Sequence, residues 1–157
     1  MKRNLPLQKS LVDIVAITIA SPLQIGVYKE GNLIKSIIKE GKTSDILPVI
    51  FDELLKKYKI NSIIYSKGPG SYMAIKLSFI FFKTLQITKN IKFFGCDGFE
   101  FNRNQPIKAV GNTFFVKKEG IISIEKEKTK GEFFLPENLN EINFSEDVSP
   151  LYVLKPV

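Results

Sequence analysis

Gly68-Pro69-Gly70-Ser71-Tyr72 separates a short isoleucine-rich stretch, residues 60–66, from a long apolar run at residues 72–86. Isoleucine-rich stretches of this length favour buried strands, and the run that follows is long enough for a helix. Glycines allow the tight geometry needed where a strand passes directly into a helix, and serine is a preferred residue at the start of helices. The sequence therefore predicts a strand, a tight turn and a helix in this order.

Gly68, Pro69, Gly70 and Ser71 form a turn that has two interpretations. In the first, the turn contacts an anion, because the amino end of a helix exposes free N–H groups. It is not a P-loop, since the Gly-Lys-Ser/Thr ending of that motif is absent. In the second, the turn is a tight connection whose last residue caps the helix, and the residues by themselves favour this interpretation.

The helix predicted at residues 72–86 carries its apolar residues in two arcs, when they are plotted at about 100° per residue. The wide arc comprises Met73, Ala74, Leu77, Ile80, Phe81 and Leu85, and the narrow arc comprises Ile75, Phe79 and Phe82. One arc is enough to cover a sheet, so the second arc predicts contact with a partner. Ala74 and Ser78 are small enough to permit close approach of another helix. The alternative is that the helix is buried on both sides within its own chain.

The preceding helix shows a similar surplus of apolar residues. Its main stripe follows a helical spacing and consists of Leu47, Ile50, Phe51, Leu54 and Tyr58. Thr43-Ser44-Asp45 is expected to cap this helix, and Ile46 and Val49 lie beside the stripe. We therefore expect both helices to form a partner interface that contains Ile46, Val49, Ile50, Tyr72, Ala74, Ile75, Ser78, Phe79 and Phe82.

Three β-rich stretches joined by turn signals precede these helices and predict an antiparallel meander, at residues 11–19, 23–28 and 33–39. A last strand is predicted at residues 91–96. The alternation of strands and helices after the meander predicts parallel pairing with right-handed crossovers. The expected fold class is α/β, with a mixed five-stranded sheet flanked by helices.

The chain is expected to consist of a leader at residues 1–10, a main domain at residues 11–106 and a small C-terminal part at residues 107–157. Within the C-terminal part, residues 107–116 and 121–125 are predicted to pair as a hairpin. Residues 126–149 are charged and loop-like. Residues 151–154 are expected to form a short strand or a docking segment.

Composition removes several classes of function. The chain has 157 residues, no histidine and one cysteine, Cys96. It therefore has no histidine-based triad, general base or zinc ligand of its own, although carboxylate and lysine chemistry stay open. A lone cysteine predicts a reduced, cytoplasmic setting, with Cys96 as a small core residue. No apolar run reaches the ~18 residues of a membrane-spanning helix, so no membrane association is expected.

The formal net charge of +7 suits an RNA-associated protein, because basic side chains attract phosphates. The lysines are scattered and alternate with glutamates. An ordinary solvated surface therefore explains the charge about as well.

Four segments carry a resemblance to one family. Residues 16–19, Ala-Ile-Thr-Ile, match a first strand that begins Ala-Ile-Asp-Thr, and residues 44–55 match a first helix with the pattern Ser-x-x-Leu-x-Pro-x-Ile-x-x-Leu-Leu approximately. Residues 68–76, Gly-Pro-Gly-Ser-Tyr-Met-Ala-Ile-Lys, match the signature Gly-Pro-Gly-Ser-Phe-Thr-Gly-Leu-Arg, and residues 150–152 are similar to the family's C-terminus. The chain thus resembles the TsaB family, formerly YeaZ, a paralogue of TsaD with an actin-like, RNase H-like fold.

The resemblance, which covers residues 11–96 well, implies a non-catalytic scaffold. TsaB pairs with a TsaD-type subunit through its two helices and supports the transfer of threonylcarbamoyl to the adenosine beside the tRNA anticodon. A TsaE-type ATPase joins the assembly, and the nucleotide and metal belong to the TsaD-type subunit, so no cofactor is expected in this chain. Without that partner the same surface would support a homodimer, and tRNA would be contacted through the complex.

Two departures from the family argue against independent ATP hydrolysis. Thr18 stands where many relatives have aspartate, and the chain is shorter than its usual relatives, so the second actin-like lobe should be largely missing. Two other classes of function stay open. One is a minimal actin-like ATPase or kinase built on the turn at residues 68–71, and the other is a small basic RNA-binding module.

Overall fold

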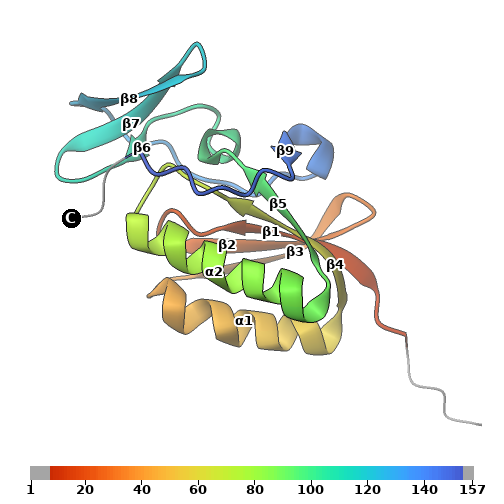
Figure 1. Ribbon diagram of the computed structural model, residues 1–157. Helices are drawn as coiled ribbons and strands as arrows, with labels where there is room; N and C mark the ends of the chain where they lie inside the picture. Colours follow the sequence, from red (N-terminus) through yellow and green to blue (C-terminus); the bar gives the residue numbers. More distant parts are fainter. Residues whose placement is uncertain (1–7, 154–157) are drawn as a thin grey trace, which may run out of the picture.

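The computed structural model describes residues 8–153 and contains a six-stranded sheet with two helices on one face (Figure 1). The strand order is β3-β2-β1-β4-β5-β9. These strands are β1 (Leu11–Ile17), β2 (Leu23–Lys29), β3 (Asn32–Lys39), β4 (Lys59–Ser66), β5 (Lys92–Cys96) and β9 (Phe144–Ser145). The helices are α1 (Thr43–Lys57) and α2 (Tyr72–Lys89). Residues 1–7 of the expected leader and Leu154 lie outside the described range.

The predicted fold class is confirmed, including the meander and the parallel part of the sheet. β1 pairs antiparallel with β2, and β2 with β3, whereas β4 pairs parallel with β1 and β5 parallel with β4. The expectation of five strands needs one correction, because β9 pairs antiparallel with β5 through Ser145 and Phe144. Two residues are too few to show a period-2 pattern, so the sequence carries no signal for β9.

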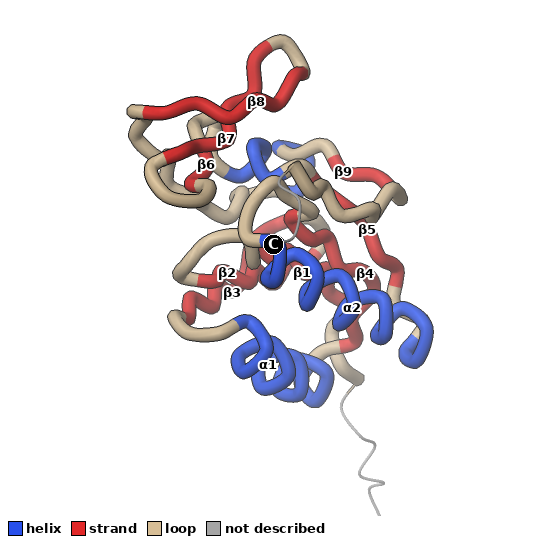
Figure 2. The backbone as a smooth tube through the Cα atoms, turned by 60° about the vertical axis from the view of Figure 1, so that its left-hand side comes forward, coloured by secondary structure: helices blue, strands red, loops and turns tan. Residues whose placement is uncertain are grey.

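Helices α1 and α2 lie side by side on one face of the sheet, as Figures 1 and 2 both show. The stripe predicted for α1 is buried there, and Leu47, Phe51 and Leu54 are each at most 2% exposed. The predicted cap is wrong: the N-cap residue is Lys42, which makes no side-chain hydrogen bond, and Thr43 is already helical. The helix instead begins with hydrogen bonds from the backbone N–H groups of Asp45 and Ile46 to the Lys42 carbonyl, both 3.0 Å long.

The opposite face of the sheet is covered by the C-terminal part of the chain and not by α1 or α2. Phe133, Leu135 and Leu139 pack against the cluster that contains Tyr28 and Ile17. The Tyr28 hydroxyl donates to the Pro136 carbonyl over 2.6 Å. Because these residues complete the core of the main sheet, the expected division at residue 106 does not separate two cores.

A three-stranded sheet projects from the end of the molecule at which α2 begins (Figures 1 and 2). Its strands are β6 (Ile107–Lys108), β7 (Thr113–Lys118) and β8 (Ile121–Lys126). The predicted hairpin is confirmed as β7 and β8, which turn at Glu119 and Gly120 with positive φ angles of 50° and 79°. The strand expected over residues 107–116 is divided, because the chain turns at Gly111 and β6 pairs antiparallel with β7. Two short 3₁₀ helices, Gly98–Phe101 and Leu139–Glu141, lie in the connections. Within residues 8–153, neither long helix has the apolar length that crossing a membrane requires.

The orientation of α2 is opposite to the expected one. Ile75, Ser78 and Phe82 are at most 1% exposed and face the sheet, so two of the three residues of the narrow arc are buried, together with Leu85 of the wide arc. The Phe82 ring centroid lies 5.3 Å from that of Phe51 on α1. Ser78 joins this face because its hydroxyl donates to the Ala74 carbonyl over 2.7 Å, which satisfies the polar atom inside the core. Ser78 was expected at the partner interface as a small residue, and it lies in the core instead.

This orientation can be tested by comparing two truncations on the same helix. We expect Phe82→Ala to lower the free energy of unfolding by about 3–5 kcal/mol, because it leaves a cavity in a closely packed aromatic cluster. Ile87→Ala should change it by less than about 0.5 kcal/mol, since Ile87 is 74% exposed. Urea unfolding followed by circular dichroism measures both values. Equal effects, or a larger effect at Ile87, would contradict the orientation of α2.

Candidate functional site: the signature turn and the outer face of helix α2

The turn at residues 67–71 lies at the carboxyl edge of the parallel strands, between β4 and α2. Gly68 has a φ of +121°, and a Cβ there would lie 2.6 Å from the Leu151 carbonyl oxygen. A Cβ at Gly70 would lie 2.9 Å from the Cβ of Ile19. Both glycines are therefore required by close approach of other parts of the same chain.

Backbone hydrogen bonds hold this turn against two other segments. The Gly68 carbonyl accepts from the Gly98 N–H over 2.8 Å, and the Lys67 carbonyl accepts from the Leu151 N–H over 2.7 Å. The segment 146–153 thus runs from β9 back to the start of α2, where the Tyr152 and Tyr72 rings lie 4.7 Å apart. The docking segment expected near the C-terminus is present, with no strand assigned within its described residues 151–153.

Ser71 is the N-cap of α2, as the sequence predicted. Its side-chain oxygen accepts from the Ala74 N–H over 3.4 Å. The geometry around residues 68–71 thus matches the interpretation of a tight, internally packed connection between a strand and a helix.

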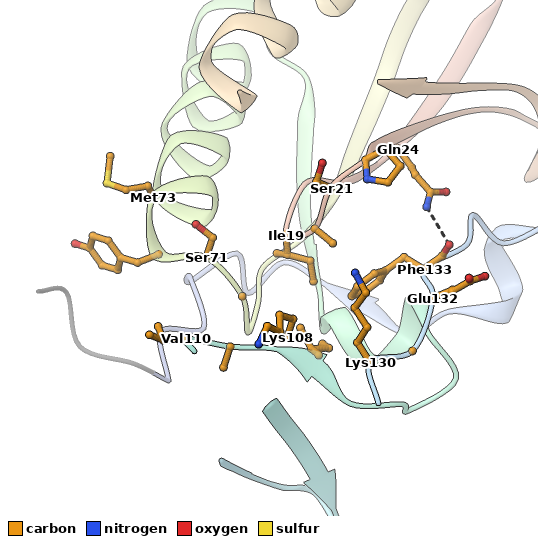
Figure 3. A pocket seen from close by; sticks show the side chains of 17 residues that line it. Ile19, Ser21, Gln24, Ser71, Met73, Lys108, Val110, Lys130, Glu132 and Phe133 are labelled. Atoms are coloured by element: carbon orange, nitrogen blue, oxygen red, sulfur yellow. Dashed lines mark hydrogen bonds between the residues drawn. The ribbon is translucent and has the colours of Figure 1, made fainter. Parts of the chain in front are cut away.

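A cleft of about 1000 Å³ opens beside the turn, between the β1–β2 connection, the start of α2 and the small sheet (Figure 3). Ile19, Met73, Val110 and Phe133 give it apolar walls. Its charged lining residues are Lys108, Lys130 and Glu132. The cleft can therefore accommodate a small organic molecule, but Glu132 is the single carboxylate of its lining.

Thr18 does not face this cleft as a free polar group. It is 3% exposed, and its hydroxyl lies 2.6 Å from the hydroxyl of Ser78. Its backbone N–H donates to the Ser66 hydroxyl over 3.1 Å. Thr18 is therefore part of a buried hydroxyl network that joins β1, β4 and α2.

The outer face of α2 carries an apolar row that includes Met73, Leu77 and Ile80 of the predicted wide arc. Met73, Ile80 and Ile87 are 56%, 50% and 74% exposed, and Leu77 is half-buried between them. With Thr84 they form a 4-3-4-3 spacing, the a/d pattern of helices that pack along one another. We call this row the outer stripe; its members are Met73, Leu77, Ile80, Thr84 and Ile87.

Two features of the outer stripe suit it to burial against another helix. The Thr84 hydroxyl donates to the Ile80 carbonyl over 2.7 Å, so burying Thr84 would leave no unsatisfied donor. Lys76 and Lys83 occupy the g positions along one side of the stripe. Neither lysine forms an ion pair with an acidic side chain of residues 8–153.

The structure divides the nine residues predicted at the partner interface into three groups. Ile50, Ile75, Ser78 and Phe82 are buried in the core of the chain, which corrects their expected position on the surface. Ile46, Tyr72, Ala74 and Phe79 are half-buried. Val49 is exposed on α1. The outer stripe was missed because an apolar arc does not reveal which side faces the sheet, although its heptad spacing could have identified it.

Cys96 is a buried, unpaired cysteine whose thiol donates to the Asn143 carbonyl over 3.2 Å. Burial, together with the nearby carboxylates of Glu100 and Asp97, raises the pKa of the thiol far above its ordinary value. Within the described chain, no three acidic or cysteine side chains gather as a metal site requires. Cys96 is accordingly placed as a core residue.

Gly68→Ala tests the packing of the turn. We expect a loss of about 1–3 kcal/mol in the free energy of unfolding, because the new methyl group would collide with Leu151 in a backbone conformation that favours glycine. Gly111→Ala is the matched control: Gly111 also has a positive φ, 63°, but its Cβ would meet open space. Thermal unfolding of both variants supplies the comparison, and an equal loss at both positions would show that contact with Leu151 is unimportant.

The state of Cys96 can be followed by alkylation with iodoacetamide. Since the raised pKa keeps the thiol protonated, native protein should react slowly even at pH ~8.5, where an ordinary cysteine is half ionised. Protein unfolded in guanidinium should react at the rate of a free thiol. Rapid alkylation of the native chain would contradict the burial of Cys96.

Comparison with known proteins gives structural neighbours. No protein-family model matches the sequence, and no curated protein sequence matches it. YeaZ from Pseudomonas aeruginosa superimposes with a TM-score of 0.58 and 11% identity, over 76% of this chain and 66% of that one. A second structure, an uncharacterized protein with similarity to peptidase YEAZ from Pseudomonas aeruginosa, gives 0.55 and 11%, over 74% and 64%.

At this level of identity the likeness concerns the fold. The chain spans slightly less than two thirds of the length of each neighbour. The mixed sheet, its two helices on one face and the turn that starts α2 together constitute the actin-like, RNase H-like fold of YeaZ structures.

Proposed function

We propose that this protein is a non-catalytic, TsaB-type scaffold subunit that pairs with a TsaD-type subunit through the outer face of α2. In this role it supports transfer of threonylcarbamoyl to the adenosine next to the tRNA anticodon. The TsaD-type partner supplies nucleotide and metal, a TsaE-type ATPase joins the assembly, and tRNA is bound by the complex. The YeaZ-like fold supports this class of function. The proposal of a helical partner rests on the outer stripe.

The outer stripe favours a helical partner because of its spacing. Met73, Ile80 and Ile87 recur every seven residues, and each exposes at least half of its side chain to solvent. A row of this kind along an 18-residue helix is costly to leave in water, and it is stabilised when another helix packs along it. Val49 on α1 is a further exposed apolar residue of the helical layer.

The lysines beside the stripe favour a different chain over a second copy. In an antiparallel pair of α2 helices, Lys76 and Lys83 of one copy would meet the same lysines of the other, and like charges across such a seam are unfavourable. A partner helix with acidic residues at the corresponding positions would instead form ion pairs. We therefore expect the TsaD-type helix to carry glutamate or aspartate along this side, with the homodimer as the weaker state.

The residues in and near the cleft favour a scaffold function over an independent ATPase activity. Mg²⁺ with nucleotide phosphates is commonly held by one or two carboxylates, so Glu132, the single carboxylate in the lining of this cleft, meets only the lower of these numbers. Thr18 stands at the position that resembles the family's aspartate, and its hydroxyl is hydrogen-bonded to that of Ser78. These residues favour nucleotide chemistry on the partner.

The proposal is tested by co-expressing the chain with the TsaD-type protein of the same organism and purifying through a tag on one of them. We expect the two proteins to elute together. Ile80→Asp should weaken the complex by roughly 30-fold or more, because it places an unpaired charge in the centre of the apolar contact. Binding is quantified by titration calorimetry with the purified proteins.

Ile38→Asp is the matched control for Ile80→Asp. Ile38 is 59% exposed and lies on β3, the edge strand at the opposite end of the strand order from β9, so the same change of residue type should leave binding unaltered. No complex with the wild-type chain, or equal weakening by both substitutions, would refute the proposed interface.

A further inference from the structure

The amino edge of the parallel strands, opposite to the cleft, carries a group of exposed lysines. Lys57 ends α1 and Lys59 begins β4, whereas Lys89 ends α2 and Lys92 begins β5. Both helices end on this side of the molecule (Figure 1). All four side chains are exposed. We call them the lysine edge: Lys57, Lys59, Lys89 and Lys92.

Backbone and side-chain contacts bring these segments together. β1 and β4 pair with Leu11 opposite Lys59, and the Lys59 N–H donates to the Ser10 carbonyl over 2.9 Å. Lys92 lies opposite Ser62 on the next strand. Lys9 reaches the same edge, because its ammonium group donates to the Leu55 carbonyl near the end of α1 over 2.8 Å.

The charge of the lysine edge is not neutralised by its surroundings. None of its four lysines forms an ion pair with an acidic side chain of residues 8–153. Among the acidic residues of the adjoining segments, Asp52 is paired with Lys56, Asp13 accepts from Asn61 and Ser62, and Glu53 stands one helical turn before Lys57. The β2–β3 turn, and Glu137 whose carbonyl accepts from Leu33, are separated from β4 and β5 by β1 in the strand order.

A purely structural explanation covers part of this group. Lysines in the last turn of a helix stabilise the negative end of its dipole, which accounts for Lys57 and Lys89. Lys59 and Lys92 lie at the starts of strands, where no such stabilisation applies. A cluster of cations drawn from two helices and two strands is the distribution expected of a surface that binds phosphates.

We propose that the lysine edge binds the phosphate backbone of nucleic acid. Lysine ammonium groups act as point charges, and the lysine edge as defined consists of lysines alone, without aromatic or arginine side chains that read bases. Contact should therefore depend on charge and not on nucleotide sequence. The proposal does not depend on the partner of α2, because the two surfaces use different residues.

Nucleic acid suits this surface better than a membrane does. A helix that binds a membrane surface lies flat and buries an apolar face along its length, whereas α1 and α2 direct their C-terminal ends toward the lysine edge (Figure 1). Leu11 is half-exposed here, but a single leucine provides little apolar area for insertion.

The test measures binding of the full chain to a short RNA hairpin and to a DNA duplex of the same sequence, between about 50 and 200 mM salt. In the variant K57Q/K59Q/K89Q/K92Q, the slope of log affinity against log salt should become shallower by about three. Affinity near 0.1 M salt should fall by roughly 100-fold or more. RNA and DNA should be affected alike.

The control variant K35Q/K39Q/K42Q/K126Q removes four exposed lysines that also form no ion pair within residues 8–153. Its affinity should stay within about threefold of the wild type, because it lowers net charge equally but leaves the lysine edge intact. Absence of binding by the wild type, equal losses in both variants, or binding to phosphatidylserine vesicles in place of nucleic acid would each overturn the proposal.

A second measurement keeps the test valid if the quadruple variant does not fold, which circular dichroism would reveal. Wild-type protein is acetylated with and without RNA, and lysine modification is mapped by mass spectrometry. Lys57, Lys59, Lys89 and Lys92 should be protected by RNA, while Lys35 and Lys126 should not. Equal protection at both sets would also overturn the proposal.

Discussion

The packing of α2 against the sheet is the constraint on which the rest of the molecule depends. Phe82 sits among aromatic rings from three other elements, with centroids 5.3 Å from Phe51, 5.9 Å from Phe93 and 6.1 Å from Tyr65. One turn earlier, the Ser78 hydroxyl lies 2.6 Å from that of Thr18, the residue that follows β1. The ring cluster resists rotation of the helix because a small change would open a cavity, and the hydroxyl pair requires Ser78 to face the strand. Everything on the outer side of α2 follows from this fixed rotation.

The two edges of the parallel strands have different physical characters. At the carboxyl edge, Gly68 and Gly70 allow Leu151 and Ile19 to approach the backbone, so that the start of α2 is held by segments distant in sequence. At the amino edge, chain reversals after both helices leave lysines exposed between the helix ends and the next strands. An apolar stripe on one side and a cationic edge on another give this small chain two separate surfaces. In the role proposed above, one surface would bind a protein partner and the other would bind phosphates.

The elements were predictable to a large extent, and their orientation was not. Period-2 and period-3.6 patterns indicated β1 to β5, both helices and the β7–β8 hairpin, because each pattern spans enough residues to be distinct. The strand at Phe144 and Ser145 was missed, since so short a strand exists through its partner β5 alone. Ser71 was correctly identified as a cap, whereas Thr43-Ser44-Asp45 was not the cap of α1, because the helix begins one residue earlier at its N-cap Lys42.

The candidate site shows the same division. By itself, the sequence determined that α2 has more apolar surface than one sheet can cover, that its turn requires glycines, and that histidine chemistry is absent from the chain. Only the tertiary structure decided which arc of α2 is outside. Ser78 belongs to the core because its hydroxyl is hydrogen-bonded to Ala74 and Thr18. Hydrophobicity alone would have assigned this serine to the surface. The lysines of the amino edge are likewise scattered along the sequence, and they become one surface because strand pairing and two helical crossovers return the chain to the same edge.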